Sequence, residues 1–251
     1  MKKPLIAVLL MLIFASFACS IQNFSMQTTE TQTVNISEGL PPNTNEAVLV
    51  FQMTGGEFSI NPGAQGLVNG TIVYNVEHWE PEFTRRNNYF GIKQADPLRF
   101  SGIPSDDVVN NWDLMLTTAL PIDLTIEGGA SENIFNLTGM QLTNLRVVQG
   151  ASDTTLRFEG HNPLTMEELS FTTGASSAKL FGLGYANFST MTMSCGAGDY
   201  TLDFSGALSR DVIVDVKAGI SNITIIIPIE TKAIVNNQGP VSNINTKGSW
   251  L

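Results

Sequence analysis

A phrase of about 22 residues recurs five times between residues 124 and 227, and it constrains the fold more than any other feature of the chain. Each copy has two apolar residues separated by one residue, then two more residues, a glycine and a small or apolar residue. The glycines are Gly129, Gly150, Gly174, Gly196 and Gly219, at intervals of 21, 24, 22 and 23 residues. A fixed period of this length predicts a repeat protein in which each copy packs against the next.

Apolar residues alternate with other residues on both sides of each glycine, which predicts two strands per repeat. The pairs five and three residues before the glycine are Leu124/Ile126, Leu145/Val147, Leu169/Phe171, Met191/Met193 and Val214/Val216. The pairs six and eight residues after it are Phe135/Leu137, Leu156/Phe158, Leu180/Gly182, Leu202/Phe204 and Ile225/Ile227. Stacking places each pair about 4.8 Å from its neighbour. The glycine is expected to have a positive φ, which permits a sharp turn between the two strands.

The predicted fold is therefore all-β: a single-stranded, β-helix-like β-solenoid with coils of about 20–24 residues and an irregular N-terminal cap. A β-sandwich is disfavoured, because its hairpins would not keep Gly-Ala at a fixed phase. At 251 residues and 43% hydrophobic content, the chain is long enough to bury a sizeable core. A formal net charge of −10 argues against a nucleic-acid partner.

The first 18 residues are typical of an export signal, because two lysines precede an apolar run that ends in small residues. The ending Ala-Cys resembles the lipobox of bacterial lipoproteins, in which Cys19 carries lipid and anchors the protein to the outer face of a membrane. Plain secretion is the alternative. Residues 19–45 are then the lipidated cysteine and a flexible tether, since this segment has no Lys or Arg and no period. With Cys19 lipidated, only Cys195 remains, so no intramolecular disulfide is expected.

The body of the protein is expected to have two parts. Residues 46–120 form an N-terminal region of the solenoid with longer excursions, in which Gly56 is the first anchor glycine. Residues 121–251 form the regular coils and a C-terminal cap. Trp250 is expected to cover the last open edge, because exposed strand edges invite aggregation.

Catalytic and metal-binding patterns are weak in this sequence. His78 and His161 are 83 residues apart without a cysteine nearby, which argues against a zinc site, and no Gly-x-Ser-x-Gly motif suggests nucleophilic hydrolysis. The acidic residues are interpreted as scattered in phase and therefore as a solvated face: Glu127, Asp153, Glu159, Asp199, Asp203 and Asp215. No catalytic residue, cofactor or metal is predicted. Calcium is left open, since Gly-Ala-Gly-Asp at 196–199 is similar to a calcium-binding nonapeptide that has a shorter period.

Three residues are candidates for surface binding. Trp79 and Trp112 lie in the distinctive phrases Glu-His-Trp-Glu-Pro-Glu and Asn-Trp-Asp-Leu, and an exposed Trp among carboxylates suits a carbohydrate. The alternative is that both pack against the core, because large aromatic side chains usually anchor cores. His161 lies in an insertion at residues 160–168, which we expect to form a short helical turn or a protruding loop.

Several motifs lie outside or within the repeats: Gly-Leu-Val-x-Gly-Thr-Ile-x-Tyr-Asn-Val at 66–76, Trp-Glu-Pro-Glu at 79–82, Asn-Trp-Asp-Leu at 111–114 and Gly-Ala-Gly-Asp-Tyr-Thr-Leu-Asp-Phe-Ser-Gly at 196–206. Through them the chain resembles the toast-rack family of bacterial surface lipoproteins, related to predicted adhesins and cell-wall-active antibiotic response proteins. The resemblance covers about residues 46–248. It implies the fold and a cell-surface location, and it brings no established catalytic residues.

The functional hypothesis is a non-enzymatic, membrane-anchored surface lipoprotein that acts in adhesion, envelope sensing or scaffolding. Its expected partners are the membrane, through the lipid on Cys19, and a cell-wall or envelope protein partner. The alternative is a polysaccharide-processing enzyme, a glycosidase or lyase on a β-helix, which would need clustered carboxylates or basic residues on one outer face.

Overall fold

The computed structural model describes residues 26–94, 105–238 and 245 of the chain. These residues form a 15-stranded, all-β structure, which confirms the predicted class. The part of the chain described contains no α-helix, only the short 3-10 turns η2 (Glu77–Trp79) and η3 (Leu183–Tyr185).

The strands fall into an N-terminal and a C-terminal group. The N-terminal strands are β1 (Gln32–Glu38), β2 (Ala47–Pro62), β3 (Val68–Tyr74), β4 (Pro81–Arg86), β5 (Tyr89–Gln94) and β6 (Asn110–Leu116). The C-terminal strands are β7 (Pro121–Asn136), β8 (Gln141–Gln149), β9 (Ser152–Arg157), β10 (Met166–Thr173), β11 (Ser176–Phe181), β12 (Phe188–Cys195), β13 (Gly198–Asp203), β14 (Ile213–Ala218) and β15 (Ser221–Ile226).

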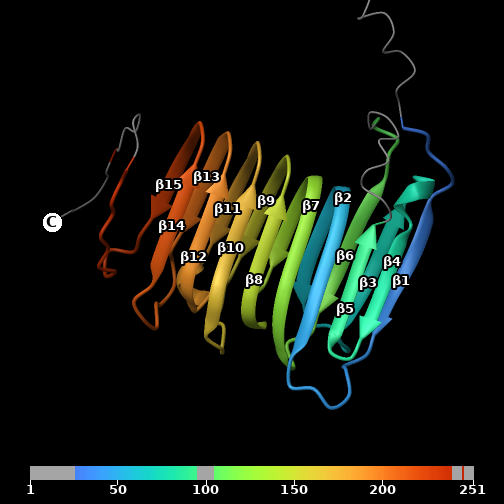
Figure 1. Ribbon diagram of the computed structural model, residues 1–251, viewed down its shortest axis with the longest axis horizontal. Coiled ribbons are helices and arrows are strands. Elements are labelled where there is room, and N and C mark those ends of the chain that lie inside the picture. The colour runs from blue at the N-terminus through green and yellow to red at the C-terminus, as the bar shows by residue number, and fades with distance from the viewer. Residues whose placement is uncertain (1–25, 95–104, 239–244, 246–251) are drawn as a thin grey trace, which may run out of the picture.

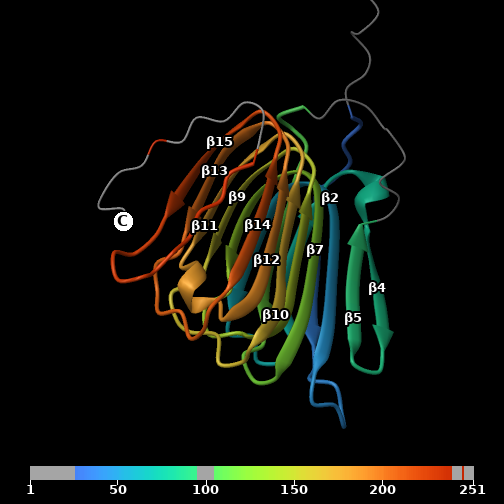
Figure 2. The same ribbon diagram turned by 60° about the vertical axis from the view of Figure 1, so that its left-hand side comes forward.

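The strands stack into two ladders that face each other across the core (Figures 1 and 2). The first ladder runs β4-β5-β2-β7-β8-β10-β12-β14, and the second runs β1-β3-β6-β2-β7-β9-β11-β13-β15. The 16-residue strands β2 and β7 belong to both, because each bends at its middle from one ladder into the other. From β7 to β15 every pairing is parallel, so each repeat adds one strand to each ladder.

The observed register is the one that the repeat spacing predicts. In the first ladder Leu124, Leu145, Leu169, Met191 and Val214 are direct neighbours in that order. In the second ladder the corresponding row is Phe135, Leu156, Leu180, Leu202 and Ile225. All but the last member of each row are buried, and together they form one continuous core that no single repeat would bury alone.

The anchor glycines occupy the corner between the ladders, but their φ angles are not positive, so the expected reason for glycine is wrong. The reason is close backbone approach. A Cβ added to Gly150, Gly174 or Gly196 would lie 2.7–2.9 Å from the carbonyl oxygen of the preceding anchor glycine. The N–H groups of these glycines donate to the same carbonyls at 3.0–3.1 Å, which holds the corners of successive repeats together.

The N-terminal register also corrects the expectation that Gly56 is the first anchor. β2 pairs with β7 so that Gly55 faces Ala130 and Gly56 faces Ser131, which places Thr54 opposite Gly129. A Cβ on Gly129 would lie 1.9 Å from the Thr54 carbonyl oxygen. Gly56 has a φ of 121° and sits two residues past the corner, against the Asn110 backbone.

The N-terminal end is closed by antiparallel strands. β1 pairs with β3, β3 with β6, and β4 with β5. β1 lies within the segment for which composition predicted a flexible tether, so that prediction is wrong for residues 32–38. Its Ile36 is buried, and its backbone continues the second ladder.

Of the insertion at residues 160–168, residues 160–165 form a connecting loop without a helical turn, and residues 166–168 are the first residues of β10. Asn162 of this loop is buried and bridges two repeats. The Asn162 side chain accepts from the Leu142 N–H at 3.1 Å and donates to the Leu142 and Ala186 carbonyls at 2.8 and 3.2 Å. The loop is therefore fixed to the body by its amide.

Candidate functional site

Trp112, one of the predicted surface-binding residues, is buried in the core with only 1% of its surface exposed. Its ring packs edge-on against Phe58, with 5.4 Å between the centroids, and its indole N–H donates to Asn110 Oδ1 at 3.1 Å. Trp79 is also buried, at the end of η2. Neither ring is exposed enough to bind a carbohydrate. Both tryptophans pack in the core, as the alternative interpretation expected.

His161 is exposed, far from both tryptophans in the sequence and in the stack of strands, and its Nε2 lies 3.1 Å from the Ser209 hydroxyl. The three predicted binding residues are therefore not brought together. Cys19 and Trp250 lie outside the described residues. Cys195 is buried at the end of β12, and burial raises the pKa of its thiol. No helix in the described segments is long and apolar enough to cross a membrane.

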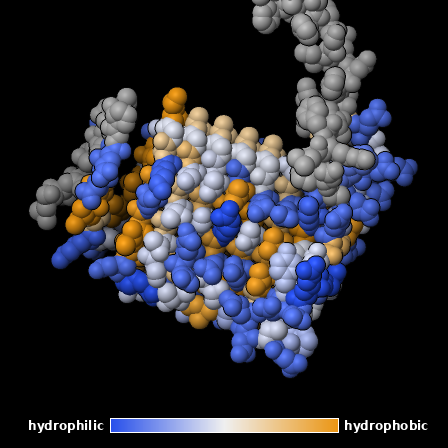
Figure 3. Space-filling model, viewed as in Figure 1, coloured by the Kyte–Doolittle hydropathy of each residue, from blue (hydrophilic) through white to orange (hydrophobic). Residues whose placement is uncertain are grey.

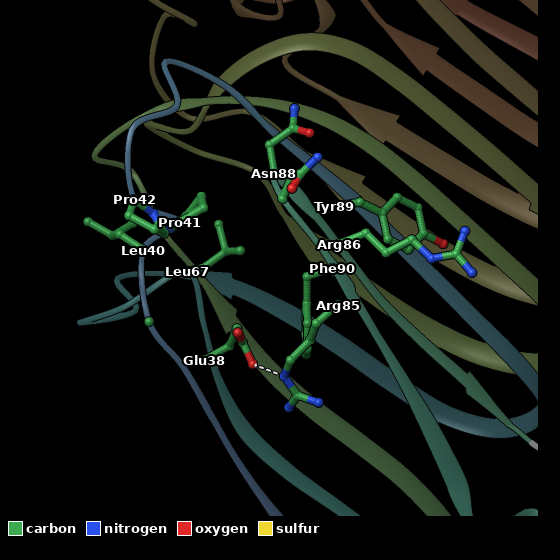
Figure 4. A pocket seen from close by; sticks show the side chains of 12 residues that line it. Glu38, Leu40, Pro41, Pro42, Leu67, Arg85, Arg86, Asn88, Tyr89 and Phe90 are labelled. Carbon is green, nitrogen blue, oxygen red and sulfur yellow. Dashed lines mark hydrogen bonds and ion pairs between the residues drawn. The ribbon is translucent and has the colours of Figure 1, made fainter.

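A cleft of about 290 Å³ lies at the N-terminal end, between the β1–β2 connection and the β4–β5 hairpin (Figure 4). One wall is apolar and consists of Leu40, Pro41, Pro42 and Leu67, with Phe90 at the base. Leu40 is 46% exposed, so its side chain is accessible from the cleft. The other wall is the polar hairpin turn, which contributes Arg85, Arg86, Asn87 and Asn88.

Arg85 is held in place from two sides. Its Nε donates to Glu38 Oε2 at 2.6 Å, and its guanidinium lies 5.4 and 5.2 Å from the ring centroids of Phe83 and Phe90. Figure 4 shows the Arg85–Glu38 pair closing one end of the cleft, while Arg86 extends away from it toward Tyr89. Arg86 has no ion pair among the described residues. Arg85 is thus already paired with a carboxylate, and Arg86 is the cation at this end of the cleft that has no acidic partner among the described residues.

The outer face of the second ladder carries a column of oxygen-bearing side chains that sequence reasoning missed. Direct neighbours in strand order are Asn111, Glu57, Glu132, Asp153, Ser177, Asp199 and Asn222. All are exposed except Ser177, which is half-buried. The interpretation of the acidic residues as scattered in phase is therefore wrong for Asp153 and Asp199.

The sequence places Asp153 and Asp199 at the same position, three residues after the anchor glycine, and the misplaced anchor explains why Glu57 was not assigned to the same column. Counted from Gly56, Glu57 is at the wrong phase, whereas counted from Thr54 it shares the phase of Glu132, Asp153 and Asp199. The remaining acidic residues of the list have local partners: Glu127 with Gln52, Glu159 with Arg157, Asp203 with Ser205, and Asp215 with Lys217. No group of three or more His, Cys, Asp or Glu within the described ranges is arranged to hold a metal ion.

A second acidic feature lies on the first ladder. Asp123 is adjacent to Glu46, and the Glu46 carboxylate accepts a hydrogen bond from the Thr143 hydroxyl at 2.6 Å. Burial, and then the Glu46 charge, raise the pKa of Asp123, while a hydrogen bond from Asn144 lowers it. The protonated form of Asp123 is thus favoured in the folded state.

Comparison with known proteins gives one family and several similar structures. The model of Toast_rack_N, the N-terminal domain of toast_rack, matches residues 23–167 and 162–226. Among curated proteins, none matches at a significant level.

Several solved structures match the chain, including one from a Clostridium and two from Parabacteroides species. One, described as a "putative cell adhesion protein" from Clostridium sporogenes, is 14% identical with a TM-score of 0.56, and the match covers 78% of this chain and 98% of that one. At this identity the similarity concerns the fold. Two others are a "putative lipid binding protein" from Parabacteroides distasonis, 8% identical with a TM-score of 0.26, and a "putative adhesin" from Parabacteroides merdae, 7% identical with a TM-score of 0.27. Each match covers 80% of this chain and 98% of the other.

Proposed function

Because the chain belongs to the toast-rack family, we propose that it is a non-enzymatic surface protein, anchored by lipid on Cys19, whose β-solenoid body binds a cell-wall or envelope partner. The export signal and the Ala-Cys ending support the anchor. The first described strand starts 13 residues after Cys19, so the linker spans at most about 45 Å when fully extended. The linker therefore limits how far the N-terminal end of the body can lie from the membrane.

The observation that carries the binding role is the N-terminal cleft. It places the exposed Leu40 in a cleft that the Arg85–Glu38 pair closes at one end and that Arg86 borders, on a chain with a net charge of −10. A partner group suited to this cleft has a small apolar part and a carboxylate or other anionic group, because guanidinium groups bind such acceptors with two hydrogen bonds. The volume fits one side chain or one sugar ring rather than a large ligand.

The test is capture of the exported Cys19→Ser protein, which stays in solution, by purified cell-wall fragments and by solubilised envelope proteins. We expect retention that falls in Leu40→Asp and in Arg86→Glu. Met115→Asp is the matched control, since Met115 is 41% exposed on the outer face of the second ladder. Retention that is absent in the parent protein, or equal in all four proteins, contradicts the proposed role of the cleft.

Anchoring has its own test. We expect labelled palmitate to enter the protein in cells and to be lost in Cys19→Ser, with the variant released into the medium. Palmitate in the Cys19→Ser protein, or none in the parent, contradicts the anchor.

A further inference from the structure

The two ends of the strand stack differ. At the N-terminal end the outermost strands β1 and β4 carry mostly polar and charged residues, including Glu82, Arg85 and Arg86 of β4. At the C-terminal end, within the part of the chain that the structure describes, the outermost strands β14 and β15 pair only with β12 and β13. Their outer edges present unpaired backbone N–H and C=O groups, which are a template for another strand.

Exposed apolar side chains gather at this C-terminal end. Of the ten large hydrophobic residues that are exposed within the described segments, seven lie between residues 213 and 235: Ile213, Ile220, Ile225, Ile226, Ile229, Ile234 and Val235. Figure 3 shows hydrophobic surface at the same end of the stack. The core rows also run into this edge, because Val214, Val216 and Ile223 are only partly buried. An open edge and an uncovered core together call for a covering partner.

We propose that this end binds a second copy of the chain, with β14 pairing antiparallel to β14 of the copy across a two-fold axis at Val216. A partner that continues both β14 and β15 needs two strands with the same alternation of inward and outward residues. These strands must also be separated by the distance between the two ladders. The C-terminal end of a second copy supplies both. The N-terminal end does not, because polar and charged side chains dominate its edge strands.

Charge complementarity selects the register. Residues opposite each other in an antiparallel pair lie on the same face of the sheet. With Val216 on the axis, Asp215 of one copy faces Lys217 of the other, and the same pair recurs on the other side of the axis. Both side chains are exposed on the outer face, where they now form an ion pair within the strand at 3.2 Å. The inward side then brings Val216 against Val216 and Val214 against Ala218, which continues the apolar row. A shift by two residues would place Asp215 against Asp215.

Residues 227–238 follow β15 and pass the same end without strand pairing. Of these, Ile229 and Ile234 are 86% and 90% exposed, so their side chains add to the exposed apolar surface of this end and do not pack on the core rows. In the dimer, the amino-terminal strands of the two copies lie at opposite ends of the assembly, since β1 and β14 are at opposite ends of one copy (Figure 1).

The test is the mass in solution of the full exported chain carrying Cys19→Ser, measured by sedimentation over a range of concentrations. We expect a dimer that is lost in Asp215→Lys and in Lys217→Asp, since each change creates like charges across the axis. The double variant Asp215→Lys with Lys217→Asp restores opposite charges and should restore the dimer. Lys179→Asp, an exposed reversal on the second ladder, is the control and should leave the dimer unchanged.

Four results would overturn the proposal. A monomer at all concentrations in which the β14 amides are protected from hydrogen exchange means that residues 227–238 cover the edge instead. A monomer with unprotected β14 amides means that the edge stays open. A dimer that survives both single reversals, or a double variant that stays monomeric, means that the register is wrong.

Discussion

Gly196→Ala is the substitution that tests most sharply how successive repeats are held together. The added methyl group would lie 2.7 Å from the Gly174 carbonyl oxygen and 3.1 Å from the carbonyl carbon. Both are backbone atoms of the corner between β10 and β11. Each of these strands is paired on two sides, so the corner cannot move without disturbing its neighbours. The Gly196 N–H also donates to the Gly174 carbonyl at 3.1 Å, and a shift that relieves the clash lengthens this bond.

The magnitude follows from two opposing effects. Forcing an extra methyl group into a packed site costs about 1–3 kcal/mol. Replacing glycine by alanine where φ is not positive returns about 0.4–1 kcal/mol, because the unfolded chain loses freedom. The clash is the larger effect, so we expect Gly196→Ala to lower the free energy of unfolding by about 1–2 kcal/mol. For a domain of this size each kcal/mol lowers Tm by roughly 2–4 °C.

Gly219→Ala is the matched control. Gly219 belongs to the same row, but its added methyl group would lie 3.2 Å from the Gly196 oxygen, a contact that a shift of a few tenths of an ångström relieves. We expect its effect on Tm to be close to zero. Urea denaturation and thermal scans of both variants check the difference. Equal stability of Gly196→Ala and the parent protein would refute close approach as the reason for the glycine row.

Four further outcomes follow. Asn162→Ala should lower the free energy of unfolding by about 1–3 kcal/mol in urea denaturation, because it leaves the buried backbone groups of Leu142 unpaired. Asp123 has a raised pKa, so its contribution to stability is present below the ordinary Asp pKa and is lost as the pH rises through the raised one. Asp123→Asn should therefore raise Tm near neutral pH and leave it unchanged in acid. A thiol reagent should label Cys195 much more slowly in the native protein than in urea, because the thiol is buried and its raised pKa disfavours the thiolate. Added salt should raise Tm, since it screens the repulsion among Glu57, Glu132 and Asp153.

The regular repeats were predictable because period and alternation act on every copy. Leu145, Leu169 and Met191 are neighbours in the structure at the phase that the glycine count gives. The rows before and after the glycine are therefore the inward-facing residues of the two ladders. The spacing of the glycines did not reveal why glycine is needed at these positions. A positive φ and a close contact between backbones both require glycine, so the sequence cannot distinguish them.

The N-terminal region was harder to predict because its contacts are long-range and its strands are of mixed direction. β1 has few apolar residues and reads as a tether, yet seven consecutive residues pair with β3, and Ile36 is buried. Trp112 appears beside carboxylates in the sequence, but alternation along β6 turns Asn111 and Asp113 outward and the indole inward. The cleft is built from the β1–β2 connection and a hairpin turn, which no local motif joins.

The register between the N-terminal region and the repeats joins the two groups of strands into one stack and aligns the carboxylate column across them. It is tested most directly by disulfide cross-linking in a background without Cys19 and Cys195. Glu57 and Glu132 are opposite each other on neighbouring strands, so the pair Glu57→Cys and Glu132→Cys should form a disulfide in the native protein. The alternative register with Gly56 as anchor places Glu57 opposite Ala130. Efficient cross-linking of Glu57→Cys with Ala130→Cys, and none with Glu132→Cys, would contradict the account.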